Sequence, residues 1–448
     1  MKRRQFIQAG ASLGLAAQLA AWAQEAGVGH ESATPGGHPP QAGAAQEGAQ
    51  RAAAPSGVMP SGPMSKGPDD QHEAMKRVVK SIYAPTRYVF VADRFSNFIS
   101  VTDIVSGEHV ETLDFSMRPH VMELARDDAM LAVGSPEVSA IEFMNLRTRE
   151  RRRVELPSPV FQLFFVPQTN LVAVGLRDQV GMISYKDFSV RIFPRRFDSD
   201  QRQTLINTYY SLLFSSFSQS FWVLDEDRPF IYHRYGGAEP LDAPWKTIDL
   251  SRHIGSGSGL GIGVASPEDD LLAMTTDDGS EGLVYFPAQD KVLSTGPMRT
   301  VGSTNEPMIM PYIDAYSKHV IFADMEGNVA LFDLVNGNGK PERFTVKFSP
   351  RFIRTGWLES TWILAGDKGI MFQSFKDPSD RKVVRFVPEV MNMWVTGDSK
   401  TALYTLDEGA PTIYRFDIRT REPLPPIRVR GVTVASMLRM GSNNSICY

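Results

Sequence analysis

The side chains best suited to chemistry gather around one histidine. His120 stands in the sequence Arg118-Pro119-His120, at the start of a predicted β-strand. An imidazole there could ligate haem iron or another metal ion, or accept a proton. The neighbouring Arg118 could bind a carboxylate or a phosphate. A capping or turn role explains the same histidine without any ligand, and both interpretations stay open.

Three further charged residues lie near prolines, at points of the repeat that resemble Arg118-Pro119-His120. Glu306 lies in Asn305-Glu306-Pro307, and Arg351 and Arg354 follow Pro350. If these points are equivalent starts of inner strands, the charges surround one mouth of a central channel, which suits a polar ligand. Solvated loop charges explain them equally well. The sequence therefore predicts a ligand site at Arg118, His120, Glu306, Arg351 and Arg354.

Catalytic motifs are not apparent. The sequence has no Gly-x-Ser-x-Gly and no His-Glu-x-x-His, and its single cysteine, Cys447, precludes a Cys-x-x-Cys-His haem attachment. The glycine-rich stretch from Gly255 to Gly263 precedes a predicted strand rather than a helix, so the helix N-terminus that binds phosphate is missing. These observations favour a non-enzymatic role and leave the cofactor unknown.

The elements that would position these residues form a repeat. Short strands followed by acidic or glycine-containing turns recur about eight times, roughly 40–50 residues apart, as propeller blades do. The first unit runs from Tyr88 to Gly134 and predicts strands at 88–92, 98–104, 109–115 and 119–124. Its turns use Asp, Asn and Gly, which cap tight turns or supply positive φ.

The repeat predicts an all-β fold, an eight-bladed β-propeller over residues 81–448. The strands from Tyr88 to Phe115 lack an inner strand of their own, and 432–438 supplies one. The C-terminal strand would therefore close the ring with the first blade, which leaves no open sheet edge. Seven blades are the alternative, if the aromatic-rich segment Gln201 to Pro244 is an insertion.

Two regions are candidates for binding a partner protein. The segment 147–153 reads RTRERRR on a predicted outer hairpin, and Arg149, Arg151 and Arg152 could attract an acidic redox carrier. The aromatic-rich unit contains Tyr209 and is followed by Trp245, and such departures from a repeat often bind something. Alternatively, the basic segment is a solvated surface turn, and the aromatic side chains fill the space between blades. With 47 basic and 51 acidic residues, the chain gives no support for nucleic-acid binding.

The N-terminus reads as a targeting segment. Arg3, Arg4 and Phe6 resemble a twin-arginine motif, a weakly apolar stretch follows, and Ala21-Trp22-Ala23 is a small-residue cleavage site. We therefore expect a signal peptide at 1–23, export by the twin-arginine translocase and a periplasmic location without a permanent membrane anchor. Residues 24–80, rich in Ala, Gly, Pro and Gln, predict a disordered linker.

The first unit also resembles a known family. Asn97 to Asp103, Ser106-Gly107, Arg118-Pro119-His120 and the polar turn to Asp128 are similar to the YVTN-type repeat of bacterial surface-layer and cytochrome d1-like propellers, near the amine dehydrogenase heavy chains. The resemblance implies eight blades and a place for His120 comparable to that of a histidine that ligates d1-type haem. The distal histidines of a nitrite-reducing site have no counterpart, so the resemblance favours a haem-handling or assembly protein over a reductase.

Two functions follow as hypotheses. The first is a non-catalytic periplasmic scaffold that binds a protein partner or a small ligand. The second is a d1-type haem-binding protein or redox subunit that uses His120 in the channel.

Overall fold

The structure is a computed structural model. It describes residues 87–125, 129–167, 169–176, 179–194, 211–237, 240–254, 258–298, 308–385, 390–406 and 411–440, without the side chains of 194, 390–391, 403–406 and 440. The predicted signal peptide and the whole of the predicted linker, residues 24–80, lie outside these residues, as do Glu306 and Tyr209. No described helix is long and apolar enough to cross a membrane.

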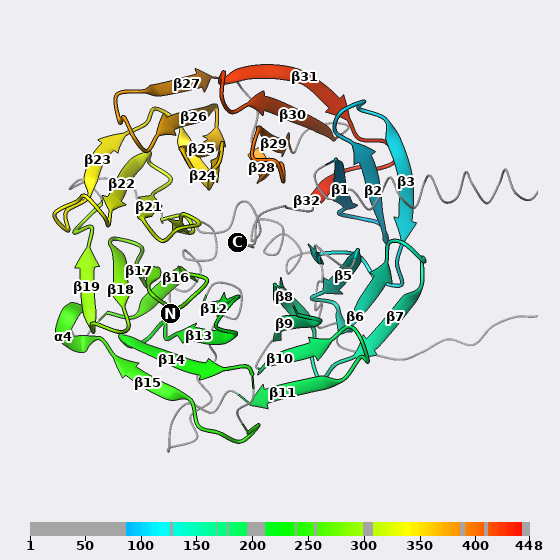
Figure 1. Ribbon diagram of the computed structural model, residues 1–448, viewed down its shortest axis with the longest axis horizontal. Coiled ribbons are helices and arrows are strands. Elements are labelled where there is room, and N and C mark those ends of the chain that lie inside the picture. The colour runs from blue at the N-terminus through cyan, green and yellow to red at the C-terminus, as the bar shows by residue number, and fades with distance from the viewer. Residues whose placement is uncertain are drawn as a thin grey trace, which may run out of the picture.

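Eight four-stranded antiparallel sheets stand around a common axis, as Figure 1 shows. We number them as blades along the chain. Blade 1 contains β1 (Tyr88–Asp93), β2 (Phe98–Asp103), β3 (His109–Asp114) and the last strand, β32 (Ala435–Met440). Blade 2 contains β4 (Val121–Leu124), β5 (Met130–Ser135), β6 (Val138–Asn145) and β7 (Arg151–Glu155).

The next three blades follow in chain order. Blade 3 contains β8 (Val160–Phe165), β9 (Leu171–Leu176), β10 (Gln179–Ser184) and β11 (Val190–Pro194). Blade 4 contains β12 (Leu212–Ser215), β13 (Ser220–Leu224), β14 (Phe230–Tyr235) and β15 (Lys246–Asp249), and the short helix α4 (Ser251–Ile254) follows it. Blade 5 contains β16 (Leu260–Ala265), β17 (Leu272–Thr276), β18 (Gly282–Phe286) and β19 (Lys291–Ser294).

Three blades complete the ring. Blade 6 contains β20 (Tyr312–Ile313), β21 (His319–Ala323), β22 (Asn328–Asp333) and β23 (Glu342–Thr345). Blade 7 contains β24 (Ser349–Gly356), β25 (Thr361–Asp367), β26 (Gly369–Ser374) and β27 (Arg381–Arg385). Blade 8 contains β28 (Val390–Val395), β29 (Thr401–Leu406), β30 (Thr412–Asp417) and β31 (Glu422–Arg428).

The predicted fold class and ring closure are confirmed. β32 pairs antiparallel with β1, with Phe90 opposite Arg439, so the end of the chain completes the blade that its beginning started. The aromatic-rich segment is not an insertion, because 212–249 forms a complete sheet of its own. The eight-bladed prediction is therefore right and the seven-bladed alternative is wrong.

Burial follows position in the blade. Counted outward from the axis, each blade has an inner strand, two middle strands and a rim strand, and in blade 1 the inner strand is β32 and the second is β1 (Figure 1). Second strands such as β1, β5 and β25 are almost wholly buried, whereas rim strands such as β7 and β15 are mostly exposed. The core therefore lies between neighbouring blades, where the faces of their middle strands pack together.

The repeated acidic turns have the expected cause. At the end of the third strand, the side chain of an Asp accepts hydrogen bonds from the backbone of the turn that follows. Asp103 accepts from Val105 N at 2.8 Å, and Asp333 accepts from Asn336 N at 2.8 Å. Asp417 accepts from Thr420 N at 2.7 Å. These caps fix each hairpin and therefore recur once per blade in several blades.

Candidate functional site

His120 lies immediately before β4, at the end where the chain enters the inner strand. Its backbone N–H donates to the carbonyl of Gly134 at 3.1 Å, and protein atoms enclose its Nε2. Burial, and then the positive charges of Arg118 and Arg94, lower the pKa of His120 to about 4. The imidazole is therefore neutral near pH 7, as a metal ligand must be. An iron atom could reach the enclosed Nε2 only if the surrounding chain moved.

The two arginines predicted near that end are each held by a carboxylate of their own blade. Arg118 Nε lies 3.0 Å from Glu137 Oε2. Arg351 Nη2 lies 2.7 Å from Asp367 Oδ2, and its side chain is only 8% exposed. Arg118 enters blade 2 and Arg351 enters blade 7, with blades 8 and 1 between them. The structure thus places both at inner-strand starts but does not bring them together.

Arg354 does not lie with them. It comes three residues after Arg351 on β24, which is about 10 Å along an extended strand, towards the opposite end of the axis. There Arg354 and Arg439 face one indole. The Trp394 ring centroid lies 5.4 Å from Cζ of Arg354 and 4.5 Å from Cζ of Arg439. Glu123 of β4 completes this axial cluster, with its Oε1 3.2 Å from Arg439 Nε.

The axial cluster carries two guanidinium groups and one carboxylate. Burial is the main cause that lowers the pKa of Arg354 to about 10, and the charge of Arg439 adds to it. Burial raises the pKa of Glu123, although Arg439 opposes that shift. The side chains of Arg439 and Glu123 remain 16% and 15% exposed. Partial burial strengthens their electrostatic interactions, so the cluster suits a planar anionic group.

The sequence prediction found one member of the axial cluster, Arg354, and missed three. Glu123, Trp394 and Arg439 are each the next-to-last residue of an inner strand. They come from blades 2, 8 and 1, which are adjacent in the ring although they are far apart in the chain. The signal that could have found them is this shared strand position, because an alignment of the repeats with one another would group the three residues.

The arginines of the basic hairpin are largely engaged within it or with blade 1. Arg149 Nη2 pairs with Glu111. Arg152 pairs with Glu150 at 3.2 Å, and Cζ of Arg151 lies 5.8 Å from the ring centroid of Phe115. Arg151 and Arg152 are exposed on the rim strand β7, where charges also prevent edge-to-edge pairing of sheets. Their predicted role in partner binding stays a prediction.

The aromatic-rich blade gives its tryptophan a packing role. Trp245 is 6% exposed and belongs to the apolar cluster that contains Phe193, Phe221 and Tyr232. It therefore offers no free surface to a partner in this conformation. The same blade holds a second buried histidine: the His233 ring packs against that of Trp222 in a tilted arrangement with centroids 3.9 Å apart, and burial lowers the pKa of His233 to about 4. Trp222 Nε1 donates to Asp269 at 2.7 Å.

Metal binding has no further candidate among the described residues, where no three His, Cys, Asp or Glu side chains are grouped to hold an ion. The residues of the predicted export signal, Arg3, Arg4 and Phe6, lie outside the described part of the chain.

Comparison with solved structures supports the fold. Dihydro-heme d1 dehydrogenase NirN in complex with DHE is similar at a TM-score of 0.61 and 14% identity, over 80% of this chain and 76% of that one. AztD from Citrobacter koseri, in its apo form, has a TM-score of 0.48 and 9% identity, over 79% of this chain and 99% of that one. No family model and no curated protein matches the sequence. The similarity to NirN confirms the resemblance to cytochrome d1-like propellers at the level of the fold.

Proposed function

We propose that the protein is a non-catalytic binding propeller that takes a planar anionic ligand at the axial cluster. The observation that carries this proposal is the pair of guanidinium groups, Arg354 and Arg439, that face one indole, Trp394. They come from three consecutive blades, 7, 8 and 1. Closure of the ring is therefore required to assemble the site.

The chemistry of the axial cluster favours a ligand with both a flat face and carboxylates. Guanidinium groups bind carboxylates in a bidentate manner, and an indole stacks on a flat apolar surface. Two adjacent guanidinium groups repel each other, and the single carboxylate of Glu123, which interacts with both, leaves one positive charge uncompensated. An anionic ligand would relieve this repulsion, so the cluster favours occupation by an anion.

A titration with paired probes tests the proposal. Mesoporphyrin IX carries two carboxylates on a flat metal-free ring, and its dimethyl ester keeps the ring without the charges. We expect the acid to quench tryptophan fluorescence and to bind at least tenfold more tightly than the ester. The double variant Arg354→Gln/Arg439→Gln should lose this preference, while Arg152→Gln on the rim keeps it. Equal affinity for acid and ester, or an unchanged double variant, contradicts the proposal.

A d1-type haem bound through His120 is the second candidate. What favours it is the neutral imidazole of His120 at the start of an inner strand, with Arg118 beside it. An absorption spectrum of the protein purified from its native host is the test. Visible bands that diminish in His120→Ala support haem ligation. A spectrum without visible bands, or bands unchanged in His120→Ala, contradicts it and leaves the binding scaffold.

Export to the periplasm completes the proposal. Its support is the order of Arg3-Arg4, the weakly apolar stretch and Ala21-Trp22-Ala23 along the sequence. The linker would then connect the cleavage site to the propeller. Replacement of Arg3 and Arg4 by lysine should leave the precursor in the cytoplasmic fraction, whereas the unaltered chain is found processed in the periplasm. Unchanged fractionation of the variant contradicts the twin-arginine route.

A further inference from the structure

The hairpin between β24 and β25 holds three consecutive non-glycine residues in a left-handed conformation. Trp357, Leu358 and Glu359 have φ angles of 50°, 56° and 60°. Each such residue costs free energy, because its Cβ approaches the following carbonyl oxygen. Runs of this kind persist only where neighbouring structure holds them, and they concentrate at functional sites.

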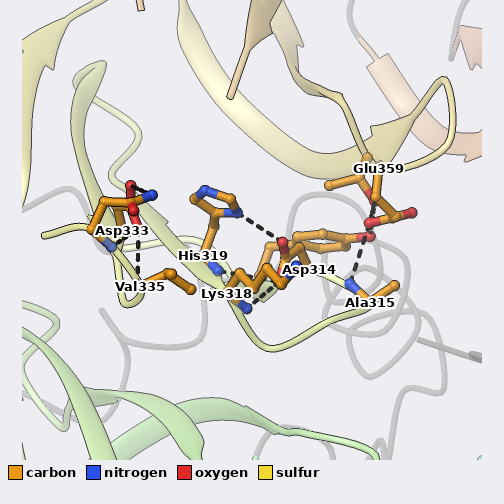
Figure 2. A network of polar contacts seen from close by, with 10 residues as sticks. Asp314, Ala315, Lys318, His319, Asp333, Val335 and Glu359 are labelled. Carbon is orange, nitrogen blue, oxygen red and sulfur yellow. Dashed lines mark hydrogen bonds and ion pairs between the residues drawn. The ribbon is translucent and has the colours of Figure 1, made fainter. Parts of the chain in front are cut away.

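Both neighbouring blades hold this turn in place. Glu359 Oε2 accepts from Ala315 N of blade 6 at 3.2 Å and from Thr355 Oγ1 at 2.6 Å, and Figure 2 shows Glu359 reaching the Ala315 backbone. On the other side, Trp357 N donates to the carbonyl of Ser399 in blade 8 at 2.6 Å. Gly356 allows the turn to lie this close to blade 8, because a Cβ at this position would lie 2.5 Å from Ile418 Cδ1.

The loop of blade 6 beside the turn is equally well fixed. Asp314 Oδ2 lies 2.8 Å from His319 Nδ1, and its Oδ1 accepts from Lys318 N at 2.6 Å (Figure 2). His319 also stacks on Phe375 of blade 7, with centroids 4.0 Å apart. Tyr316 therefore projects from a rigid loop.

These contacts present apolar side chains to solvent. Leu358 is 77% exposed and Tyr316, on the adjoining loop, is 63% exposed. An exposed leucine on a strained turn does not stabilise the fold, because an apolar side chain contributes to stability only when it is buried. A rigid, exposed apolar pair is the kind of surface that binds a partner.

Cations flank the apolar pair. Lys318 Nζ lies 5.3 Å from the Tyr316 ring centroid, and Arg419 Cζ lies 5.6 Å from that of Trp357. Lys400, next to Ser399, is exposed. Among residues 314–318, 357–360 and 396–400, the exposed carboxylate is that of Asp398, which accepts from Thr396 Oγ1 at 2.6 Å and from Lys400 N at 3.1 Å. The exposed Asp270 of blade 5 also borders the patch, because it accepts from Ser317 Oγ at 3.2 Å. Three exposed cations and two hydrogen-bonded carboxylates therefore leave the rim with excess positive charge around an apolar centre.

We propose that the Leu358 patch, defined as Tyr316, Lys318, Trp357, Leu358 and Arg419, docks a segment of a partner protein. That segment presents an aliphatic or aromatic side chain flanked by carboxylates. The apolar side chain packs between Leu358 and Tyr316, and the carboxylates pair with Lys318 and Arg419. This inference concerns a surface other than the axial cluster and does not depend on the ligand proposed there.

Selection from a random dodecapeptide library displayed on phage tests the chemistry without knowledge of the partner. We expect the immobilised protein to enrich peptides with one apolar residue between acidic ones. Leu358→Asn, which suits the left-handed conformation, and Lys318→Glu/Arg419→Glu should each weaken binding of the enriched peptide at least tenfold. Val105→Ser, at an equally exposed valine of the β2–β3 loop, is the matched control and should leave binding unchanged.

Two further measurements keep the outcome decisive. Glu359→Gln leaves every side chain of the patch in place but weakens the hydrogen bond from Ala315 N. It should therefore reduce the affinity for the enriched peptide several-fold. Arg354→Gln/Arg439→Gln should leave peptide binding intact, which separates this proposal from that of the axial cluster. An enriched sequence without acidic residues, or equal binding by Leu358→Asn, overturns the proposal. So does a dimer by sedimentation that Leu358→Asn converts to a monomer, because a second copy would then occupy the patch.

Discussion

The two ends of the inner strands use arginine in different ways. At the entering end, Arg118 is paired with Glu137 and Arg351 with Asp367, each within its own blade. At the other end, Arg354 and Arg439 come from different blades, share Trp394 and have Glu123 as the neighbouring carboxylate. Ion pairs within one blade, such as Arg118–Glu137 and Arg351–Asp367, are typical of contacts that stabilise the end of a hairpin. Excess charge shared between blades is typical of a binding site.

The difference shows why charge at a strand start is a weak guide to function. Pro350-Arg351 and Arg118-Pro119 look alike in the sequence, and both guanidinium groups are satisfied locally. Arg354 and Arg439 each donate to the carbonyl of the preceding residue, but the aromatic and charged side chains that they contact belong to other blades. The following predictions test that contrast, from the largest expected effect to the smallest.

The largest effect should come from the axial cluster. We expect Arg354→Gln/Arg439→Gln to weaken mesoporphyrin binding at least about 100-fold, because two charge-assisted contacts contribute about 1.5–3 kcal/mol each. The free energy of unfolding should change less than the affinity, because the removed repulsion between the guanidinium groups partly offsets the loss of Arg439 as the partner of Glu123. Fluorescence titration and urea unfolding measure the two quantities. If the double variant lost stability but kept its affinity for mesoporphyrin, Arg354 and Arg439 would have a structural role and not a binding role.

The Arg351–Asp367 pair should show the opposite pattern. Arg351→Met removes the cation from a buried site and leaves Asp367 unpaired, so the free energy of unfolding should fall by about 2 kcal/mol. Mesoporphyrin affinity should stay within twofold. A double-mutant cycle with Asp367→Asn isolates the pair. A coupling energy near zero would mean that the pair does not fix this hairpin.

The two buried histidines predict an acid-sensitive stability. The pKa values of His120 and His233 are both about 4 in the folded chain, below the ordinary 6.5. Between pH 4 and 6.5 the unfolded chain therefore binds more protons, so stability rises with pH and is lost as pH falls through this window. Each histidine contributes a slope of up to about 1.4 kcal/mol per pH unit.

Unfolding midpoints measured from pH 4 to 7 check this slope. His120→Gln and His233→Gln should each flatten it, and together they should flatten it more. His109→Gln, on the rim strand β3, is the matched control. If neither variant changes the slope, the two imidazoles are not buried in the neutral form.

The smallest effect belongs to the partly exposed pairs. Arg118→Gln should lower the free energy of unfolding by at most about 1 kcal/mol, since its side chain and that of Glu137 are 30% and 20% exposed. Arg152→Gln should have almost no effect, because both partners are 61% exposed. Added salt should reduce the first effect further. A loss of several kcal/mol for Arg118→Gln would show that the entering end depends on this charge.

The fold was largely predictable because its signals are local and repeated. Strand alternation, Asp caps such as Asp103 and Asp333, and the missing inner strand of the first blade each appear within a few residues of sequence. The site was less predictable. Arg351 and Arg354 belong to one strand, and nothing in their sequence context tells which end of the axis each one faces. The burial of Trp245 was equally hidden, because its neighbours Phe193 and Phe221 come from other strands.

The amino-acid sequence by itself determined the blades, their number and the closure of the ring, because hydrogen-bonded hairpins and their caps depend on neighbouring residues. The tertiary structure alone decided that Glu123, Trp394 and Arg439 meet, because blades 2, 8 and 1 become neighbours only when the last strand pairs with the first. It also decided that Leu358 is held outward, since that turn depends on hydrogen bonds from two other blades. Contacts between blades are set by the geometry of the closed ring, which no short stretch of sequence contains.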